Sequence, residues 1–245
     1  MRANYKLQRL HVTGKLEADA VVEPDRAQTN YLLKVLRRRE GDDLLVFNGH
    51  DGEWRARIEI RSKKACVLRC VSIERTQVAK PDIVFCFAPL KTGRLDYVIQ
   101  KATEMGVGSI RPVMTEFTQN RRVLPEKMRA WAIEACEQCG VLNVPECHEL
   151  KYLRELIEAW DPSRALIFCD EDEQTQNPLT KLRDVGNRKL ALLIGPEGGF
   201  SDAEREHLRE LPFVVSIPLG PRILRADTAA VAAMALVQAT IGDWR

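Results

Sequence analysis

The chain has 245 residues, of which 45% are hydrophobic and 29% charged, a composition typical of a globular protein and unlike that of disordered or collagen-like chains. Its formal net charge of +2 excludes a histone-like, strongly basic nucleic-acid coat protein. Residues 1–80 hold 17 Lys and Arg against 11 Asp and Glu, so the positive charge is concentrated in the first third of the chain. Such an uneven distribution indicates a polyanionic partner.

Neither a signal peptide nor a membrane segment is apparent. The N-terminal sequence M-R-A-N-Y-K-L-Q-R-L-H-V lacks the apolar run of a signal peptide, and the longest apolar stretch, residues 229–237, is far shorter than the roughly 20 residues that span a membrane. The seven cysteines are an odd number and lie mostly among apolar neighbours, which suits reduced thiols better than a disulfide framework. We therefore expect a cytoplasmic protein.

Short strand-like segments dominate residues 1–75. Residues 44–47 and 54–60 are separated by Asn-Gly and Asp-Gly pairs, which are typical of hairpin turns. Residues 28–38 instead carry apolar side chains at helical spacing. These patterns predict a small β-rich barrel or sandwich with one helix as the first domain.

Several cations of this domain are candidates for contact with nucleic acid. Four of them cluster at the end of the predicted helix, where they can meet phosphates. The alternative is a solvated helix end whose cations oppose the negative end of the helix dipole. The cations of the first domain that we predict to bind RNA are Arg9, Lys34, Arg37, Arg38, Arg39 and Arg55.

The pattern changes after residues 76–81, a polar, proline-containing linker. Near-continuous apolar runs, typical of strands covered on both faces, occupy residues 83–88, 165–169, 190–194 and 214–217. Helical patterns between them occupy residues 94–105, residues 125–139, a segment opened by the capping box 201–204, and an Ala-rich last helix capped by Asp227 or Thr228. The alternation predicts an α/β domain over residues 82–245 with a mostly parallel sheet.

A glycine-rich turn stands out in residues 193–201, L-I-G-P-E-G-G-F-S, where a buried strand leads into a capped helix. Its glycines indicate that the backbone comes close to another group. The spacing matches neither G-x-G-x-x-G nor the P-loop, which argues against a phosphate cradle. A plain strand-to-helix turn is the alternative.

Residues 217–229 repeat the same arrangement, with a Pro- and Gly-containing loop between a strand and a helix. Two such loops at the carboxyl edge of one parallel sheet would form a crevice lined by backbone amides and carbonyls. Such a lining suits an adenosine moiety.

Together these segments resemble the RsmE family of SPOUT-type methyltransferases, which modify N3 of a uridine in 16S ribosomal RNA. The resemblance rests on I-G-P-E-G-G-F-S at 194–201, L-G-P-R-I-L-R-A-D-T-A at 219–229, G-R-L-D-Y-V-I-Q-K-A-T-E-M-G-V at 93–107 and E-A-C-E-Q-C-G at 134–140. Y-L-L-K-V-L-R at 31–37, G-D at 41–42 and F-N-G-H-D-G-E-W at 47–54 are similar to that family's PUA-like RNA-binding domain. The resemblance implies S-adenosylmethionine as methyl donor, a deep trefoil knot, and a homodimer whose active site lies near the subunit interface.

The resemblance also implies a set of cofactor-binding residues in the two loops and the start of the last helix. They are Ile194, Gly195, Pro196, Glu197, Gly198, Gly199, Leu219, Gly220, Ile223, Leu224, Thr228 and Ala229. The chain departs from the family pattern at Asp227, where glutamate is usual, and at residues 141–143, Val-Leu-Asn, which replace arginines.

Methylation of uridine N3 removes a proton and spreads negative charge onto the ring carbonyls, which calls for an acidic group and a cation. We assign Arg225 to charge stabilisation or base positioning, and Asp227 or Glu197 to proton acceptance. The structural alternatives are a helix cap for Asp227 and a turn residue for Glu197. Arg94 and Lys101, opposite the apolar stripe of their helix, are further candidates for RNA contact.

Other interpretations of the sequence are weaker. Cys136, Cys139, Cys147 and His148 resemble a zinc-binding set, but the first two lie within a helical pattern and no second C-x-x-C follows, so we expect no metal. An enzyme acting on another RNA such as tRNA, or a non-catalytic RNA-binding protein of ribosome assembly, remain alternatives to 16S rRNA methylation. Binding of labelled S-adenosylmethionine distinguishes the enzymes from the non-catalytic protein.

Overall fold

The computed structural model describes residues 6–91, 93–171, 177–186 and 188–244, which form two compact units. The first contains residues up to Lys80 together with Cys136–Val144, and the second contains Pro81–Ala135 and the chain from Pro145 onward. The segment Cys136–Val144 thus packs with the first unit, although its place in the sequence is within the second predicted domain.

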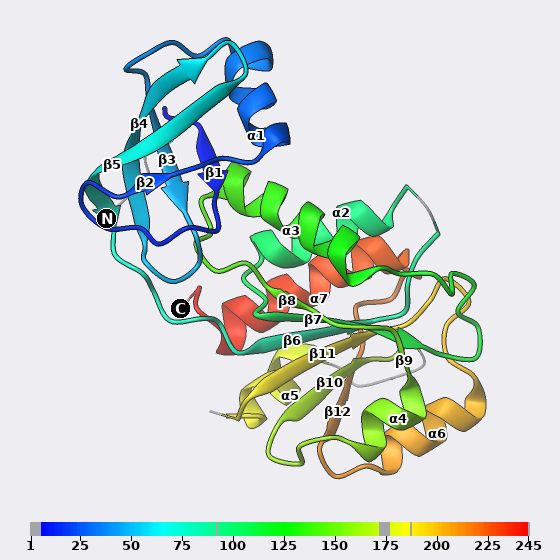
Figure 1. Cartoon of the computed structure of the whole chain (residues 1–245). Helices are drawn as coiled ribbons and strands as arrows, with labels where there is room; N and C mark the ends of the chain where they lie inside the picture. Colours follow the sequence, from blue (N-terminus) through cyan, green and yellow to red (C-terminus); the bar gives the residue numbers. More distant parts are fainter. Residues whose placement is uncertain (1–5, 92, 172–176, 187, 245) are drawn as a thin grey trace. The chain divides into compact units, whose positions relative to one another are not determined.

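The first unit is built on a five-stranded sheet in the order β1-β3-β4-β5-β2 (Figure 1). Its strands are β1 (Arg9–His11), β2 (Val21–Val22), β3 (Asp43–Phe47), β4 (Glu53–Ser62) and β5 (Ala65–Arg75). β1 runs parallel to β3, and the other neighbouring pairs are antiparallel. The sheet contains both segments that the sequence predicted as strands.

The turn between β3 and β4 is stabilised by hydrogen bonds between the Asn48 side chain and the backbone. The Asn48 side-chain oxygen accepts hydrogen bonds from the backbone N–H groups of His50 and Asp51 at 3.0 and 2.9 Å, an arrangement that favours a tight turn. Gly52 has a φ of +84°, and a Cβ at this position would lie 2.4 Å from the carbonyl oxygen of Arg75. Only glycine fits there.

The helix of this unit is shorter than the sequence predicted. Helix α1 (Arg26–Asn30), capped by Asp25, continues as a π-helical turn over Tyr31–Val35. Arg37 then adopts a left-handed φ of +53°, which costs energy for a residue with a Cβ and ends the helix. The apolar spacing extended the predicted helix to residue 38 because it does not register this reversal.

Residues 141–143 stand where the resemblance to the RsmE family leads us to expect arginines, and two of them have structural roles in the first unit. Leu142 is buried in a cluster with Phe47 and Cys136. The Asn143 amide accepts a hydrogen bond from Gln77 at 2.8 Å and donates to the carbonyls of Val78 and Ala79. The segment following helix α3 is therefore fixed by packing and hydrogen bonds.

The second unit is an α/β fold whose sheet has the order β12-β10-β11-β6-β7-β8, with β9 paired to β7 and every pair parallel. The predicted parallel α/β sheet is confirmed. Its strands are β6 (Ile83–Phe87), β7 (Ser109–Met114), β8 (Glu146–Cys147), β9 (Lys151–Tyr152), β10 (Ala165–Cys169), β11 (Leu190–Ile194) and β12 (Val214–Ile217).

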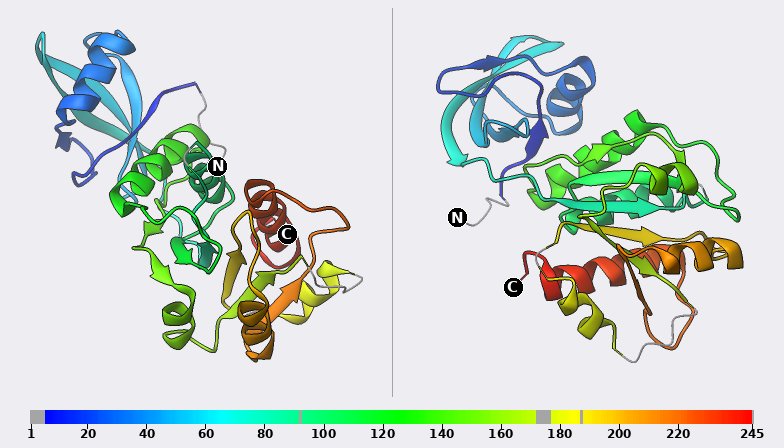
Figure 2. Two further views of the ribbon diagram at one scale, coloured as in Figure 1. Left: turned by 90° about the vertical axis from the view of Figure 1, so that its right-hand side faces the viewer. Right: turned by 90° about the horizontal axis from the view of Figure 1, so that it is seen from below.

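Helices cover both faces of this sheet. They are α2 (Leu95–Glu104), α3 (Pro125–Cys139), α4 (Leu153–Glu158), α5 (Pro178–Asp184), α6 (Asp202–Glu210) and α7 (Ala226–Ile241). Apolar side chains of α4 and α6 join a buried cluster on one face, and α2 and α7 pack together on the other (Figures 1 and 2). Among the residues that the structure describes, no helix is both long and apolar enough to cross a membrane.

The strand order decides where the two loops meet. β10 lies between β11 and β12, so the carboxyl ends of three adjacent parallel strands share one edge. In parallel sheets, ligands bind outside this edge. The sequence predicted two loops here, and the structure adds the end of a third strand between them.

Candidate active site

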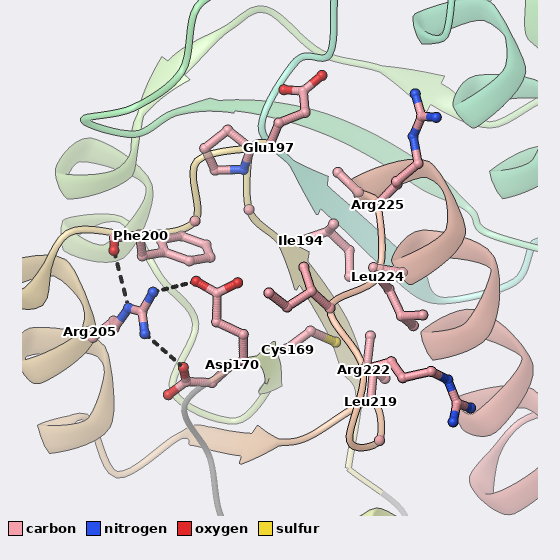
Figure 3. A pocket seen from close by; sticks show the side chains of 18 of the residues that line it. Cys169, Asp170, Ile194, Glu197, Phe200, Arg205, Leu219, Arg222, Leu224 and Arg225 are labelled. Carbon is pink, nitrogen blue, oxygen red and sulfur yellow. Dashed lines mark hydrogen bonds and ion pairs between the residues drawn. The ribbon is translucent and has the colours of Figure 1, made fainter.

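A cavity of about 600 Å³ lies at the carboxyl ends of β10, β11 and β12 (Figure 3). Its volume falls in the range of roughly 300–1,000 Å³ that is typical of small-molecule sites. Residues of the three strand ends, of both loops and of the first turn of α7 line it. The cavity lies entirely within the second unit.

The glycine turn needs its glycines because neighbouring groups approach the backbone closely. A Cβ added at Gly195 would lie 2.5 Å from the ring of Phe200, and one at Gly199 would lie 2.4 Å from a carboxylate oxygen of Glu171. Gly199 also has a φ of +71°. Ser201 then caps helix α6 through a capping box with Glu204, as the sequence predicted.

The second loop, between β12 and α7, contributes mainly its backbone and its cations. Gly220 has a φ of +99°, which lets the chain reverse at the cavity. Ile223 is 92% exposed, and Arg222 and Arg225 carry exposed side chains with no carboxylate partner among the described residues.

Most of the predicted cofactor-binding residues line the cavity. They are Ile194, Gly195, Pro196, Glu197, Gly199, Leu219, Gly220, Ile223, Leu224 and Ala229. Gly198 and Thr228 do not line it. A Cβ at Gly198 would instead meet Phe117 at 3.3 Å, so this glycine faces the outer side of the turn.

The three predicted catalytic residues are placed differently. Arg225 and Glu197 line the cavity, and Figure 3 shows both side chains extending to the same side, away from Ile194 and Leu224. Asp227 does not line the cavity. Its carboxylate accepts a hydrogen bond from the backbone N–H of Thr228 at 2.8 Å and lies 3.9 Å from Nε of Arg94.

The predicted cap of helix α7 needs correction. The N-cap is Arg225, so neither Asp227 nor Thr228 caps the helix. Asp227 lies in the first turn, where a negative charge interacts favourably with the helix dipole.

Sequence reasoning missed a charged cluster in the wall of the cavity, formed by Asp170, Glu171 and Arg205. Arg205 donates from Nε to the carbonyl of Phe200 at 3.1 Å and from a terminal nitrogen to Glu171 at 2.5 Å, and its other nitrogen lies 3.8 Å from the buried Asp170 (Figure 3). The sequence contains a signal that could have revealed this cluster: the acidic pair Asp170 and Glu171 directly follows the predicted strand 165–169, at the same sheet edge as the glycine turn.

Cys169 also lines the cavity, but its environment argues against a role as nucleophile. Burial raises the pKa of the Cys169 thiol well above its usual range, and the nearby Asp170 carboxylate raises it further. Since the thiolate is the reactive form, a raised thiol pKa disfavours nucleophilic attack by this cysteine at neutral pH.

The predicted RNA-binding cations divide into two groups. Arg9 is only 3% exposed and donates to Glu53 at 2.9 Å, so the prediction that it contacts RNA is corrected to a structural role. Arg55 pairs with Glu74 at 2.8 Å and Lys101 with Glu104 at 2.7 Å. By contrast, no carboxylate of the described chain pairs with Lys34, Arg37, Arg38 or Arg39.

The cysteines and histidine considered for zinc take part in other contacts. Cys136 Sγ donates to the carbonyl of Asn143 at 3.9 Å, and Nε2 of His148 hydrogen-bonds the hydroxyl of Ser109 at 2.9 Å. Within the described ranges, no group of three or more His, Cys, Asp and Glu side chains is arranged to hold a metal ion.

Comparisons with known families cover both parts of the chain. A family model described as an RNA methyltransferase domain matches residues 78–238, and one described as an RNA methyltransferase PUA domain matches residues 24–69. Ribosomal RNA small subunit methyltransferase E of Rickettsia conorii is 29% identical over 235 residues, covering 95% of this chain and 96% of that protein. The enzyme of the same name from Mesomycoplasma hyopneumoniae is 30% identical over 206 residues, covering 81% of this chain and 86% of that protein.

Solved structures give the same result. A methyltransferase from Legionella pneumophila, solved with bound S-adenosylmethionine, is 32% identical with a TM-score of 0.82, covering 96% of this chain and 98% of that one. Ribosomal RNA small subunit methyltransferase E from Neisseria gonorrhoeae, also bound to S-adenosylmethionine, is 25% identical with a TM-score of 0.82, covering 98% and 100%. The resemblance seen in the sequence is therefore confirmed: the chain is an RNA methyltransferase that belongs to the family of ribosomal RNA small subunit methyltransferase E, the RsmE family.

Proposed function

We propose that this enzyme transfers the methyl group of S-adenosylmethionine to N3 of a specific uridine in 16S rRNA, forming 3-methyluridine in the small ribosomal subunit. The observation that carries the proposal is one cavity, built from the glycine turn and its partner loop, that presents both a carboxylate, Glu197, and a cation, Arg225. Its relatives named for the small ribosomal subunit support the choice of RNA.

The cavity suits the proposed donor. Ile194, Leu219 and Leu224 provide apolar walls for an adenine ring, and the backbone of both loops provides hydrogen-bonding groups around it. Glu171 adds a carboxylate that is able to accept hydrogen bonds from ribose hydroxyls. When bound, S-adenosylmethionine would supply an electrophilic methyl group for the transfer.

The reaction replaces the N3 proton of uridine with a methyl group, so the site must accept one proton. We assign this task to Glu197, because its carboxylate lies at the cavity. Asp227 is held by Thr228 and lies near Arg94 outside the lining, so we assign it to positioning Arg94, which does line the cavity.

Arg225 stabilises the negative charge that develops on the uracil oxygens as N3 loses its proton. Its guanidinium lines the cavity and is not neutralised by a carboxylate of the described chain. A single donor of this kind contributes a factor of about 10² to 10³ in kcat.

The proposal extends to the architecture that the family implies. We assign residues 1–75 to a PUA-like RNA-binding domain, residues 82–245 to a SPOUT domain with a deep trefoil knot, and residues 76–81 to the linker. The RNA-binding part of the first domain is formed by four cations that no carboxylate of the described residues pairs with, Lys34, Arg37, Arg38 and Arg39. The enzyme acts in the cytoplasm as a homodimer with its active site near the subunit interface, which light scattering coupled to size exclusion tests.

The decisive experiment incubates the purified protein with methyl-labelled S-adenosylmethionine and small ribosomal subunits that lack the modification. Digestion of the RNA and mass spectrometry then identify the labelled nucleoside. The proposal predicts 3-methyluridine in 16S rRNA. Label on another nucleoside, or on tRNA alone, would overturn the substrate assignment, and absence of transfer to any RNA would point to a non-catalytic RNA-binding protein.

A further inference from the structure

The loop between β7 and α3 exposes an aromatic ring and two adjacent cations. In the segment of residues 115–122, here called the 115–122 loop, Phe117 is 44% exposed, and Arg121 and Arg122 carry exposed side chains. Neither arginine has a carboxylate partner among the residues that the structure describes. None of these three residues lines the cavity.

Hydrogen bonds hold the base of this loop rigid. The hydroxyl of Thr118 accepts from the backbone N–H of Thr115 at 3.0 Å and lies 2.8 Å from the Thr115 hydroxyl. The backbone N–H of Thr118 donates to the Thr115 carbonyl at 3.2 Å. Both threonines are 4% exposed, so Phe117 projects from a turn whose base is buried and hydrogen-bonded.

The loop lies directly beside the active-site turn. A Cβ at Gly198 would be 3.3 Å from Cβ of Phe117, and Gly198 is the residue next to Glu197 of the cavity. The backbone N–H of Glu116 donates to Glu204 at the start of α6 at 2.9 Å. The Asn120 amide donates to the carbonyl of Leu90 at 2.8 Å, which anchors the other end of the loop.

An exposed aromatic ring on a rigid turn, followed by two unneutralised arginines, is the combination that binds single-stranded RNA. Bases stack on aromatic faces, and arginines neutralise the phosphates between them. An enzyme that modifies the Watson–Crick edge of a base must take that base out of its stack, which leaves the neighbouring base without a partner. A ring beside the cavity can replace the lost stacking.

We propose that the 115–122 loop binds the single-stranded RNA next to the target uridine, with a flanking base stacked on Phe117 and its phosphates near Arg121 and Arg122. This inference rests on the proposed function, since it takes the RNA substrate as given. It assigns the loop to positioning of the substrate and leaves binding of the methyl donor to the cavity.

The stacking role is tested with Phe117→Ala, Phe117→Leu and Phe117→Tyr. The measurements are the Kd for a short, fluorescein-labelled single-stranded RNA by anisotropy, KM and kcat for methylation of small subunits, and the affinity for S-adenosylmethionine by calorimetry. Loss of one stacked base weakens binding about 5- to 150-fold. We expect the Ala and Leu variants to raise Kd and KM by such a factor, the Tyr variant to match the wild type, and cofactor affinity to stay unchanged.

The matched control is Trp244→Ala, which removes an exposed aromatic ring beyond the far end of α7 from the cavity. It should leave both RNA affinity and KM unchanged. A Leu variant as active as the Tyr variant would show that only apolar packing matters and would overturn the stacking role. Loss of cofactor affinity in the Ala variant would overturn it as well, because it would reveal a structural defect of the glycine turn.

The phosphate contacts are tested by the double variant Arg121→Ala/Arg122→Ala. For single strands, each neutralised phosphate contributes about 0.7 to the slope of log K against log salt, so losing two should lower the slope by about 1.4. Arg183→Ala, which removes an exposed cation on α5, should leave the slope unchanged. An unchanged slope in the double variant overturns the inference.

These results separate the inference from the proposed function. If the wild type methylates small subunits and the loop variants do so with unchanged KM and Kd, the inference fails and the function stands. If the wild type binds RNA in a Phe117-dependent manner without methylating uridine, the proposed function fails and the RNA-binding loop stands.

Discussion

Each unit contains a buried carboxylate held between two arginines, and the two differ in what they support. In the first unit, Glu53 is fully buried and accepts hydrogen bonds from Arg9 at 2.9 Å and from Arg75 at 2.7 and 2.8 Å. In the second unit, Asp170 is 2% exposed, accepts from Arg209 at 2.9 Å and lies 3.8 Å from Arg205.

The arginines extend these two networks to different targets. Arg75 also donates to the carbonyl of Gly140 at 2.8 Å, so the Glu53 network fixes the segment that follows α3. Arg205 donates to the carbonyl of Phe200 at the glycine turn and to Glu171, both in the cavity lining. The same arrangement stabilises a fold in one unit and shapes a ligand site in the other, because only Asp170 follows a strand that ends at the cavity.

The largest effects are expected from breaking these two networks with Glu53→Gln and Asp170→Asn. Removal of one partner from a buried ion pair leaves charges uncompensated and costs about 3–5 kcal/mol. Both variants should therefore lower the free energy of unfolding, measured by urea denaturation. Only Asp170→Asn should also weaken binding of S-adenosylmethionine in calorimetry, because its network holds the glycine turn. Equal cofactor affinities in the two folded variants would contradict the difference drawn between the networks.

Arg225 and Arg205 both line the cavity but differ in their partners. Arg225 has no carboxylate partner in the described chain, so Arg225→Ala should lower kcat about 10²- to 10³-fold while leaving the unfolding midpoint unchanged. Arg205→Ala should instead lower the unfolding midpoint, because it leaves Asp170 without one of its cations. Single-turnover methylation and thermal unfolding of both variants provide the check. An Arg225→Ala enzyme with near-normal transfer would remove this residue from the mechanism.

In the first unit, Arg37 and Arg55 differ in whether a carboxylate of the described residues pairs with them. Arg37 has no carboxylate partner in the part of the chain that the structure describes, and its left-handed φ of +53° is strained. Arg37→Gly therefore removes a charge and relieves the backbone at the same time. We expect weaker RNA binding, with a salt slope lowered by about 0.7–0.9, and no loss of thermal stability. The matched control is Arg55→Ala, whose guanidinium already pairs with Glu74 and Asp43 and should leave RNA binding unchanged.

The parts of the fold that depend on local sequence were predictable. The helix predicted over residues 125–139 has the observed bounds, because Pro125 opens it and Gly140 follows its last residue. The strands of residues 165–169, 190–194 and 214–217 were found from uninterrupted apolar runs. β7 was missed because Arg111 and Pro112 interrupt its apolar pattern.

The active site was predictable only in part, for a physical reason. The glycines of both loops are local signals, since close approach and positive φ exclude other residues. The pairing of Asp170 with Arg205 depends on the position of β10 between β11 and β12. The spacing of apolar residues in the sequence does not indicate the order of strands in a sheet. The same holds for charges, because a count of arginines does not separate Arg9, buried against Glu53, from Arg37.

The smallest effect is expected from a carboxylate near the surface that contrasts with the two buried ones. Asp51 accepts hydrogen bonds from the backbone N–H of Leu16 at 2.9 Å and from the Asn48 amide at 2.7 Å, and the first of these lowers its pKa most, below the ordinary value of 3.8. Because the folded-state pKa is lowered, the stabilisation is complete above the ordinary value and is lost as the pH falls through the folded one. Asp51→Asn should therefore cost less than about 1 kcal/mol at pH 7 and flatten the acid dependence of stability. Urea unfolding at pH 7 and at pH 3 tests this, and parallel pH profiles for the variant and the wild type would show that solvent already compensates the carboxylate.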